Sequence, residues 1–206
     1  MPSGEAAERL RAFLQKPFTP ESLAFEGPRR ARRSGQVGGE SIMGSQAKLI
    51  FLCGKMAAGK STLSKALAGQ EQAVLLAQDD WLAQLFPGEI LDVPGYILRA
   101  DRLNAALTPL IVSLLSRGTS VVLDFPGNTP TQRAWFRQLF EAAGVEHELH
   151  FVDVPDDVCK RQLRQRSAGL PAGTPWTAEA EFDTVTSYFK PPTPDEGFHV
   201  IRHERA

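Results

Sequence analysis

Residues 47–62 read AKLIFLCGKMAAGKST. The first seven, 47–53, form a short apolar run that stops at a glycine, which is typical of a buried parallel strand. The next eight, Gly54–Ser61, match the pattern G-x-x-x-x-G-K-[ST] at every fixed position. The stretch therefore predicts a strand, a phosphate-binding loop and a helix that begins where the loop ends.

Each part of this loop has a physical role in binding phosphate. The glycines allow a tight turn that points successive backbone N–H groups at phosphate oxygens, and the N-terminus of the following helix adds its positive end. Lys60 is expected to reach the β- and γ-phosphates, the Ser61 hydroxyl to bind Mg²⁺, and Thr62 to contact an inner phosphate. The expected nucleotide-binding residues are Gly54, Ala57, Ala58, Gly59, Lys60, Ser61 and Thr62.

Downstream of the loop, short apolar runs alternate with segments of helical periodicity. Strands are expected at 74–77, 120–123, 148–154 and 199–201, and helices at 59–67, 81–86, 101–116, 130–143 and 156–166. Such alternation predicts a parallel sheet covered on both faces. The expected fold class is α/β, a three-layer P-loop NTPase domain with a mostly parallel five-stranded sheet.

Three carboxylates follow two of the predicted strands. In doubly wound sheets ligands bind beyond the carboxyl ends of the strands, so these side chains are expected at the edge that carries the phosphate loop. Asp124 has the position of a Walker B carboxylate that holds Mg²⁺, or it starts a turn. Asp79 is the preferred base for the proton of an attacking hydroxyl, and Asp80 would then cap the following helix.

Composition and charge exclude several classes of protein. The chain has 206 residues, and 23 Lys+Arg against 24 Asp+Glu give no overall electrostatic attraction to nucleic acid or an anionic membrane. With 42% apolar and 23% charged residues, it is neither collagenous nor wholly disordered. No apolar stretch approaches the roughly 18 residues of a membrane helix, and two cysteines are too few for a disulfide scaffold. We expect a cytoplasmic protein.

The first 45 residues differ in character from the rest. They contain the basic run Arg29–Arg33 followed by a glycine-rich stretch. The expected division is a flexible N-terminal extension, 1–45, and a P-loop kinase-like domain, 46–206. Two alternatives stay open: the basic run is an arm that contacts phosphates, or Met43 is the natural start.

The motifs together resemble those of the small P-loop kinases. That group includes polynucleotide 5′-kinase domains, gluconate and adenylylsulfate kinases, chloramphenicol phosphotransferase and zeta-toxin kinases. The resemblance is strongest to the AAA_33-type ATP-binding proteins, in which segments like 124–133 and 189–198 are familiar. It covers residues 47–203 and rests on Gly54–Ser61, on the aspartates after the second strand and on Asp124.

The resemblance implies ATP as the phosphate donor, Mg²⁺, and Asp79 as the base that activates the hydroxyl of a small-molecule acceptor. It also implies catalytic arginines on a mobile lid after the fourth predicted strand, here Arg164 and Arg166, with 167–175 as the closing loop. Lys60 completes the expected catalytic set. Polynucleotide kinases carry an arginine where this chain has Leu82, which argues against a nucleic-acid acceptor.

Several further residues are candidates for acceptor binding. The apolar segment 84–99 is expected to set acceptor specificity, and Trp81 could wall the acceptor pocket. Asn128 and Arg133 either bind the acceptor or are a capping residue and a surface arginine. The expected function is an ATP-dependent small-molecule kinase. The alternatives are a nucleotide-binding switch with slow hydrolysis, and a nucleic-acid end kinase that uses the basic arm.

Overall fold

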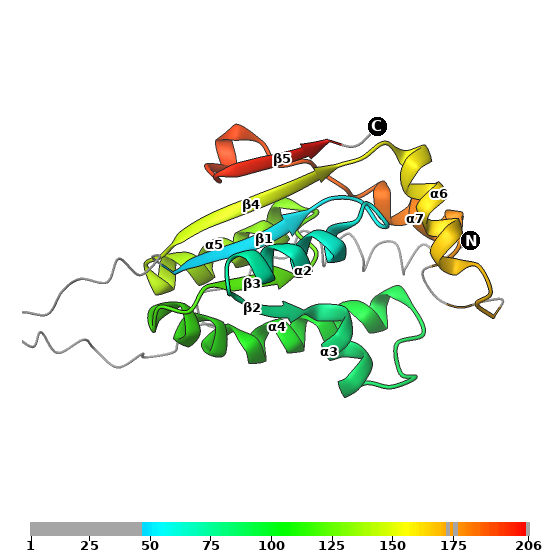
Figure 1. The fold of residues 1–206 in the computed structure, drawn as a ribbon. Coiled ribbons are helices and arrows are strands. Elements are labelled where there is room, and N and C mark those ends of the chain that lie inside the picture. Colours follow the sequence, from blue (N-terminus) through cyan, green and yellow to red (C-terminus); the bar gives the residue numbers. More distant parts are fainter. Residues whose placement is uncertain (1–46, 172–173, 175–176, 205–206) are drawn as a thin grey trace, which may run out of the picture.

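The computed structural model describes residues 47–171, 174 and 177–204. The predicted extension 1–45 and Trp176 lie outside the described residues. The described part contains a sheet of five parallel strands in the order β2-β3-β1-β4-β5 (Figure 1). The strands are β1 (Lys48–Cys53), β2 (Val74–Ala77), β3 (Val121–Asp124), β4 (Glu146–Asp153) and β5 (Val200–Glu204). The predicted parallel five-stranded sheet is confirmed.

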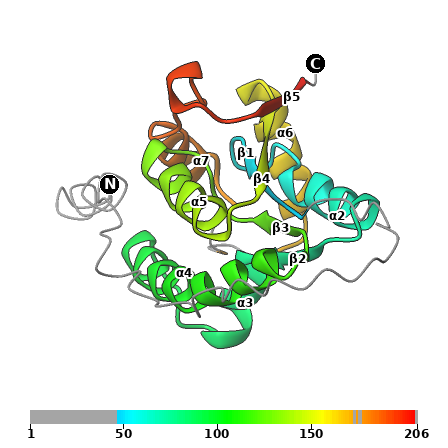
Figure 2. The same ribbon diagram turned by 90° about the vertical axis from the view of Figure 1, so that its left-hand side faces the viewer.

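Helices cover both faces of this sheet (Figure 2). Ile50 and Leu52 of β1 pack with Leu67 of α2 (Lys60–Gln70) on one face. Leu49 and Phe51 lie on the other face, against α4 (Val93–Ser116) and α5 (Pro130–Ala143). Because β1 is buried on both sides, its sequence is continuously apolar rather than alternating.

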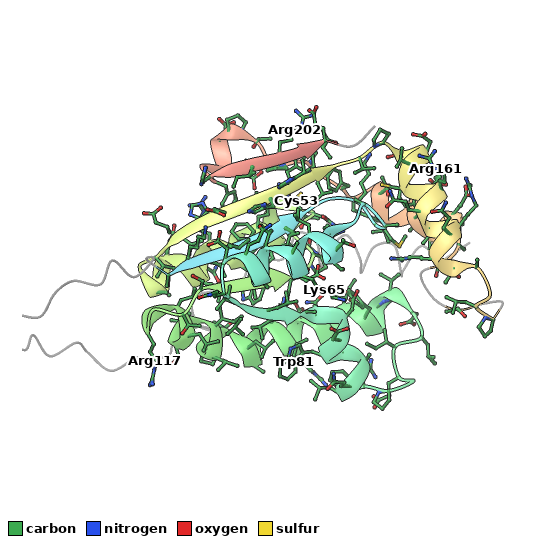
Figure 3. The ribbon with its side chains drawn as sticks, in the orientation of Figure 1. Cys53, Lys65, Trp81, Arg117, Arg161 and Arg202 are labelled. Carbon is green, nitrogen blue, oxygen red and sulfur yellow. The ribbon has the colours of Figure 1, made fainter. Side chains whose placement is uncertain are left out.

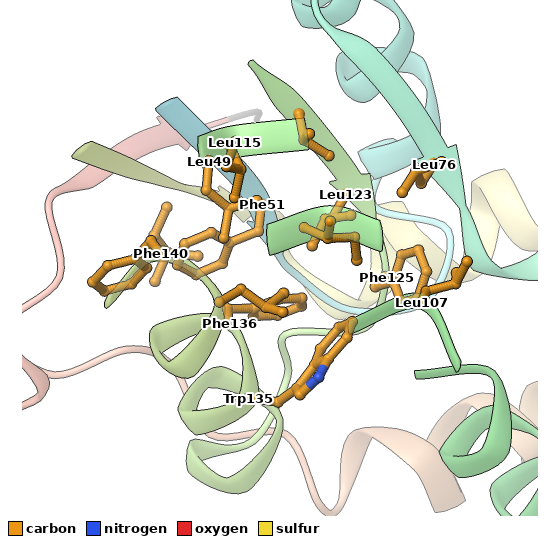
Figure 4. Close-up of a cluster of buried hydrophobic side chains, with 14 of the residues drawn as sticks. Leu49, Phe51, Leu76, Leu107, Leu115, Leu123, Phe125, Trp135, Phe136 and Phe140 are labelled. Carbon is orange, nitrogen blue, oxygen red and sulfur yellow. The ribbon is translucent and has the colours of Figure 1, made fainter. Parts of the chain in front are cut away.

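The larger core cluster fills the space between the sheet and the pair α4 and α5 (Figure 4). Phe51 stacks on Phe136 of α5 with ring centroids 4.6 Å apart, and Trp135 lies 5.2 Å from the Phe136 ring. The Trp135 indole N–H donates to the Thr108 hydroxyl of α4 at 3.1 Å. This packing fixes the carboxyl end of β1, where the phosphate loop begins.

Helix α4 is longer than the sequence pattern predicted, because it starts at Val93 rather than at 101. Asp92 is its N-cap and accepts a hydrogen bond from the Gly95 N–H at 2.7 Å. Pro94 lies in the first turn, where a missing N–H costs nothing. The extension places the second half of the segment 84–99 on a helix.

The short helix α3 (Gln78–Leu85) also starts earlier than predicted. Its N-cap is Ala77, and both Asp79 and Asp80 lie in its first turn without a side-chain capping bond. The prediction that one of these aspartates caps the helix was therefore wrong. Helix α3 follows β2 directly, so the chain has no separate loop in which a capping residue could stand.

A second cluster joins the carboxyl end of the sheet to α6 (Asp156–Ser167) and α7 (Glu179–Thr186). Val158, Cys159 and Leu163 of α6 pack with Phe182 of α7 and with Ala58 of the phosphate loop. Between α7 and β5 lies one turn of 3₁₀-helix, η2 (Pro194–Glu196). None of the described helices has the length and apolarity that a membrane span requires.

Candidate functional site

The phosphate loop has the geometry that its sequence predicts. Gly54 follows β1, and a Cβ on it would lie 2.7 Å from the Val152 carbonyl oxygen, so only glycine fits there. Ala57 and Gly59 have left-handed backbone, with φ of 59° and 98°, which turns the chain back before α2 begins at Lys60. The Gly54 N–H donates to Asn128 Oδ1 at 3.0 Å, which ties the start of this loop to the loop after β3.

Lys60 lies inside the loop that precedes it. Its Nζ donates to the carbonyl oxygens of Gly54 at 2.7 Å and Lys55 at 2.8 Å. Burial lowers its pKa, although the Asp124 and Asp79 carboxylates act in the opposite direction. These two bonds hold the ammonium within the loop.

A cavity of about 920 Å³ opens at the carboxyl ends of the strands. The predicted nucleotide-binding residues that line it are Ala57, Gly59, Lys60, Ser61 and Thr62. Gly54 and Ala58 are buried and do not line it. Asp79, Asp124 and Arg166 also face this cavity, so residues from four separate segments meet there.

The two carboxylates come from the neighbouring strands β2 and β3. Ala77 pairs with Asp124 in the register of the sheet, and Asp79 follows two residues after Ala77. Asp79 is open to the cavity, and desolvation together with the Asp124 charge raises its pKa, while Lys60 and Arg166 oppose the shift. Asp80 does not line the cavity, so Asp79 is the one of these two aspartates that faces it.

The residues around the loop fit a magnesium ion. The Ser61 hydroxyl and the Asp124 carboxylate line the same cavity, and oxygen ligands of this kind are those that Mg²⁺ prefers. The described residues contain no cluster of three His, Cys, Asp or Glu side chains suited to a metal. Mg²⁺ in nucleotide sites needs no such cluster, because it is bound through one or two protein groups, waters and substrate phosphates.

The two predicted lid arginines, Arg164 and Arg166, lie in different surroundings in the structure. Arg166 lines the cavity, and its charge acts on Asp79. Arg164 pairs with Glu179 of α7 and does not line the cavity. Arg161 is exposed on α6 (Figure 3). Of the two arginines implied by the resemblance, the structure brings only Arg166 to the candidate site.

Arg133 is neither a surface arginine nor a ligand-binding residue, and the predictions for it were wrong. It is fully buried, and its guanidinium donates to the carbonyl oxygens of Gly127 and Lys190 at 2.9 Å each. Two further bonds of 2.7 Å join it to the Glu196 carboxylate. No local pattern signals this role, since the partner lies 63 residues away.

Trp81 and Cys53 also lie away from the candidate site's chemistry. Trp81 is 37% exposed on α3 and does not line the cavity, so it walls no acceptor pocket. Cys53 is buried within the fold (Figure 3), and burial raises the pKa of its thiol to about 11. Such a thiol is a packing residue rather than a nucleophile.

Sequence reasoning missed a polar network beside the cavity. The Tyr96 hydroxyl donates to Gln78 Oε1 at 2.7 Å, and Gln78 Nε2 donates to Asn104 Oδ1 at 3.0 Å. Tyr96 lines the cavity, and burial raises the pKa of its phenol, so it stays protonated. Tyr96 lies in the apolar segment 84–99, which the sequence already marks as a candidate for acceptor binding. Its position beside the cavity depends on the start of α4 at Val93, which the sequence pattern did not predict.

Comparisons with known proteins agree with this architecture. The model of the AAA_33 family, described as an AAA domain, matches residues 49–192. No curated protein sequence matches the chain.

Solved structures with a similar fold include a Chloroflexus aurantiacus protein assigned as a kinase, with 21% identity and a TM-score of 0.58 over 77% of this chain and 88% of that one. Another is the Mycobacterium tuberculosis APS kinase CysC in complex with AMPPNP and APS, with 21% identity and a TM-score of 0.54 over 78% and 91%. A chain of the Pnkp1/Rnl/Hen1 RNA repair complex matches with 18% identity and a TM-score of 0.50 over 77% and 48%. The shared fold is that of the P-loop kinases.

Proposed function

We propose that this chain, which belongs to the AAA_33 family, is an ATP-dependent kinase that phosphorylates a hydroxyl group of a small molecule. One observation carries the proposal: the phosphate-binding loop and the carboxylate of Asp79 line the same cavity. A loop alone would suit any nucleotide-binding protein. A carboxylate in the same cavity as the loop can take the proton of an acceptor hydroxyl.

The nucleotide end of the cavity is built to hold phosphates. The backbone N–H groups of the loop, the Lys60 ammonium and the Thr62 hydroxyl supply donors and positive charge. Ser61 and Asp124 would hold Mg²⁺, which when bound neutralises negative charge on the donor phosphates. Asn128 supports this end indirectly, because it holds the Gly54 N–H at the start of the loop.

Asp79 orients the acceptor hydroxyl and takes its proton. The bond from the acceptor oxygen to the γ-phosphorus forms as the bond from that phosphorus to the β–γ bridging oxygen breaks, so ADP leaves with the electron pair. A base whose pKa is raised toward the working pH accepts a proton more readily than an ordinary aspartate. Arg166 stabilises the charge on the phosphoryl group during transfer.

The fold is compatible with the proposed kinase function. The similar solved structures include the APS kinase and the protein assigned as a kinase, each spanning over three quarters of this chain. At about 21% identity they support the fold, and the choice of acceptor rests on the residues of this chain alone.

The test is ADP release from Mg-ATP with and without a pooled metabolite extract, for the wild type and for Asp79→Asn. A kinase releases ADP faster when the extract is added, and only in the wild type. If release ignores the extract and survives Asp79→Asn, the protein is a slow ATPase switch and the assignment of Asp79 is wrong.

A further inference from the structure

We infer that the acceptor is an uncharged and largely apolar alcohol, an inference that rests on the proposed kinase function. It comes from the half of the cavity that lies away from the phosphate loop. Nucleotide-binding residues line one end of the cavity, and Asp79 marks the position of the reacting hydroxyl. The side chains beyond Asp79 are therefore the ones that the acceptor would contact.

Apolar side chains dominate that half of the cavity. They come from α3, the segment after it, the first turns of α4 and the residue that follows β3. The main ones are Leu82, Phe86, Ile90, Ile97 and Phe125. Apolar and aromatic linings of this kind bind the apolar part of a small molecule.

This apolar wall is formed before any ligand binds. Leu82 and Phe125 are each only 2% exposed and belong to the main core cluster. Phe86 and Ile90 are partly buried and pack against the same cluster. Because these side chains are held by the core, they cannot easily move aside to admit a charged group and its water.

The charges in the cavity are confined to the reacting centre. Among the described residues that line it, Lys60 and Arg166 are the only lysine and arginine. Lys60 is held within the phosphate loop, and the charge of Arg166 acts on Asp79. Both cations therefore lie where the phosphoryl group is transferred, so the apolar wall offers no cation of its own.

Two cations that lie near aromatic side chains of the cavity lining are already paired. The Arg99 guanidinium lies 5.4 Å from the Phe86 ring centroid and donates to Glu89 at 3.0 Å. The Lys55 ammonium lies 6.0 Å from the Phe189 ring centroid and pairs with Asp156. Neither Arg99 nor Lys55 lines the cavity.

This distribution selects against an anionic acceptor. A phosphate, sulfate or carboxylate on the acceptor would be desolvated against apolar side chains without a cation or a bidentate arginine to bind it. A neutral alcohol with an apolar body would bury that body and place its hydroxyl at Asp79. Uncharged hydrogen-bonding groups in the lining, such as the amide of Gln132, could then orient it.

The test divides a pooled metabolite extract by charge and polarity. An anion exchanger at neutral pH retains the anionic fraction, and a reverse-phase column divides the flow-through into an apolar and a polar neutral fraction. Each fraction is added to wild-type protein with Mg-ATP, and ADP release is measured beside Asp79→Asn. We expect the neutral fraction retained by the reverse-phase column to give the stimulation.

A matched pair of variants tests the role of the wall. Ile97 lines the cavity and is partly buried, whereas its neighbour Leu98 is 50% exposed and does not line it. Ile97→Arg should reduce the stimulation by the neutral fraction at least about tenfold, because it places a charge where an apolar group binds. Leu98→Arg should leave the stimulation unchanged, and circular dichroism shows whether both variants are folded.

The outcomes separate this inference from the function on which it rests. Stimulation only by the anionic fraction, or by the polar neutral fraction, overturns the inference and leaves the kinase function intact. If Ile97→Arg is folded and keeps full stimulation, the wall does not bind the acceptor, and the inference is again overturned. If no fraction and no whole extract stimulates the wild type beyond Asp79→Asn, the kinase function fails and the inference fails with it.

Discussion

Arg133 and Glu196, which are 63 residues apart in the chain, form a bidentate ion pair. Nε and Nη2 of the arginine donate to the two carboxylate oxygens at 2.7 Å each. Arg133 lies in the first turn of α5, and Glu196 is the last residue of η2, shortly before β5. The guanidinium also donates to the Gly127 carbonyl in the loop after β3. The pair therefore fastens the segment before β5 to the loop that carries Asn128.

Arg133→Met should destabilise the fold by about 3–5 kcal/mol. The substitution leaves the Glu196 carboxylate without its cation and the Gly127 carbonyl without its donor, and removing one partner of a buried pair has an effect of this size. Urea denaturation measures the change. The control is Arg117→Met, at an exposed position after α4, which should change stability by less than about 0.5 kcal/mol.

The same pair should make stability depend on pH in the acid range. Burial alone would raise the pKa of Glu196, but the hydrogen bonds from Arg133 and the Thr193 backbone outweigh it and lower the pKa. A carboxyl group whose pKa is lower in the folded protein stabilises the fold fully above its unfolded pKa of about 4.3. This stabilisation is lost as the pH falls through the folded pKa. Acidification should therefore lower the free energy of unfolding less in Arg133→Met than in the wild type. Equal decreases in the two proteins would show that the pair does not cause the pH dependence.

Gly127→Ala and Gly69→Ala should change stability in opposite directions. A Cβ on Gly127 would lie 2.5 Å from the Leu52 carbonyl oxygen and 3.1 Å from the Phe136 ring, so overpacking should cost about 1–3 kcal/mol. A Cβ on Gly69 of α2 meets nothing within 4 Å, and alanine in a helix should stabilise by about 0.5–1 kcal/mol. Thermal unfolding of the two variants checks both signs, and a stable Gly127→Ala would show that the loop after β3 can shift.

The sequence predicted those parts of the fold that rest on local patterns. The phosphate loop, the parallel sheet and the start of α5 at Pro130 follow from short motifs. In the structure Thr129 caps this helix by accepting a hydrogen bond from the Gln132 N–H. The start of α4 was missed because Pro94 and Gly95 suggest a loop. The signal was nevertheless present, since an aspartate before a proline in the first turn is a helix start.

Arg166→Gln and Arg164→Gln should have different effects on turnover. Arg166 lines the cavity, and its loss should lower kcat about 100-fold, the effect of removing one donor to a developing charge. Arg164 pairs with Glu179 outside the cavity, so Arg164→Gln should lower kcat less than about threefold. Steady-state kinetics with the stimulating extract fraction measures both.

A pH profile adds a second readout for Arg166. Its charge lowers the pKa of Asp79, so Arg166→Gln should raise that pKa and move the acid limb of kcat/KM to higher pH. An unshifted limb would mean that Arg166 does not act on the base. Equal losses of turnover in the two variants would show that the lid moves both arginines into the site.

Lys60→Met should abolish stabilisation by nucleotide. A ligand at 100 times its Kd raises the free energy of unfolding by about 2.7 kcal/mol, and Mg-ATP should do so for the wild type. Lys65→Met, an exposed position on the same helix, should keep the full effect. The rise in melting temperature on adding Mg-ATP measures this stabilisation. An unchanged rise in Lys60→Met would show that the loop is not the nucleotide site.

The candidate site was predictable only in part. Lys60, Asp79 and Asp124 follow directly from a motif and from strand ends, because parallel strands bring their carboxyl ends to one edge. The separation of Arg164 from Arg166 depends on how α6 packs against α7, and the burial of Arg133 depends on a partner 63 residues away. Neither relationship leaves a pattern in the local sequence.

Transfer of the γ-phosphate to an acceptor can be followed with a radioactive label. Wild-type protein and Asp79→Asn are incubated with γ-³²P-labelled Mg-ATP and the pooled extract, and the label is separated into inorganic phosphate and organic phosphate esters. A kinase with Asp79 as its base gives a labelled organic product in the wild type and at least about 100-fold less in Asp79→Asn, with nucleotide binding retained. Label found only in inorganic phosphate, at equal rates in both proteins, would contradict the proposed function.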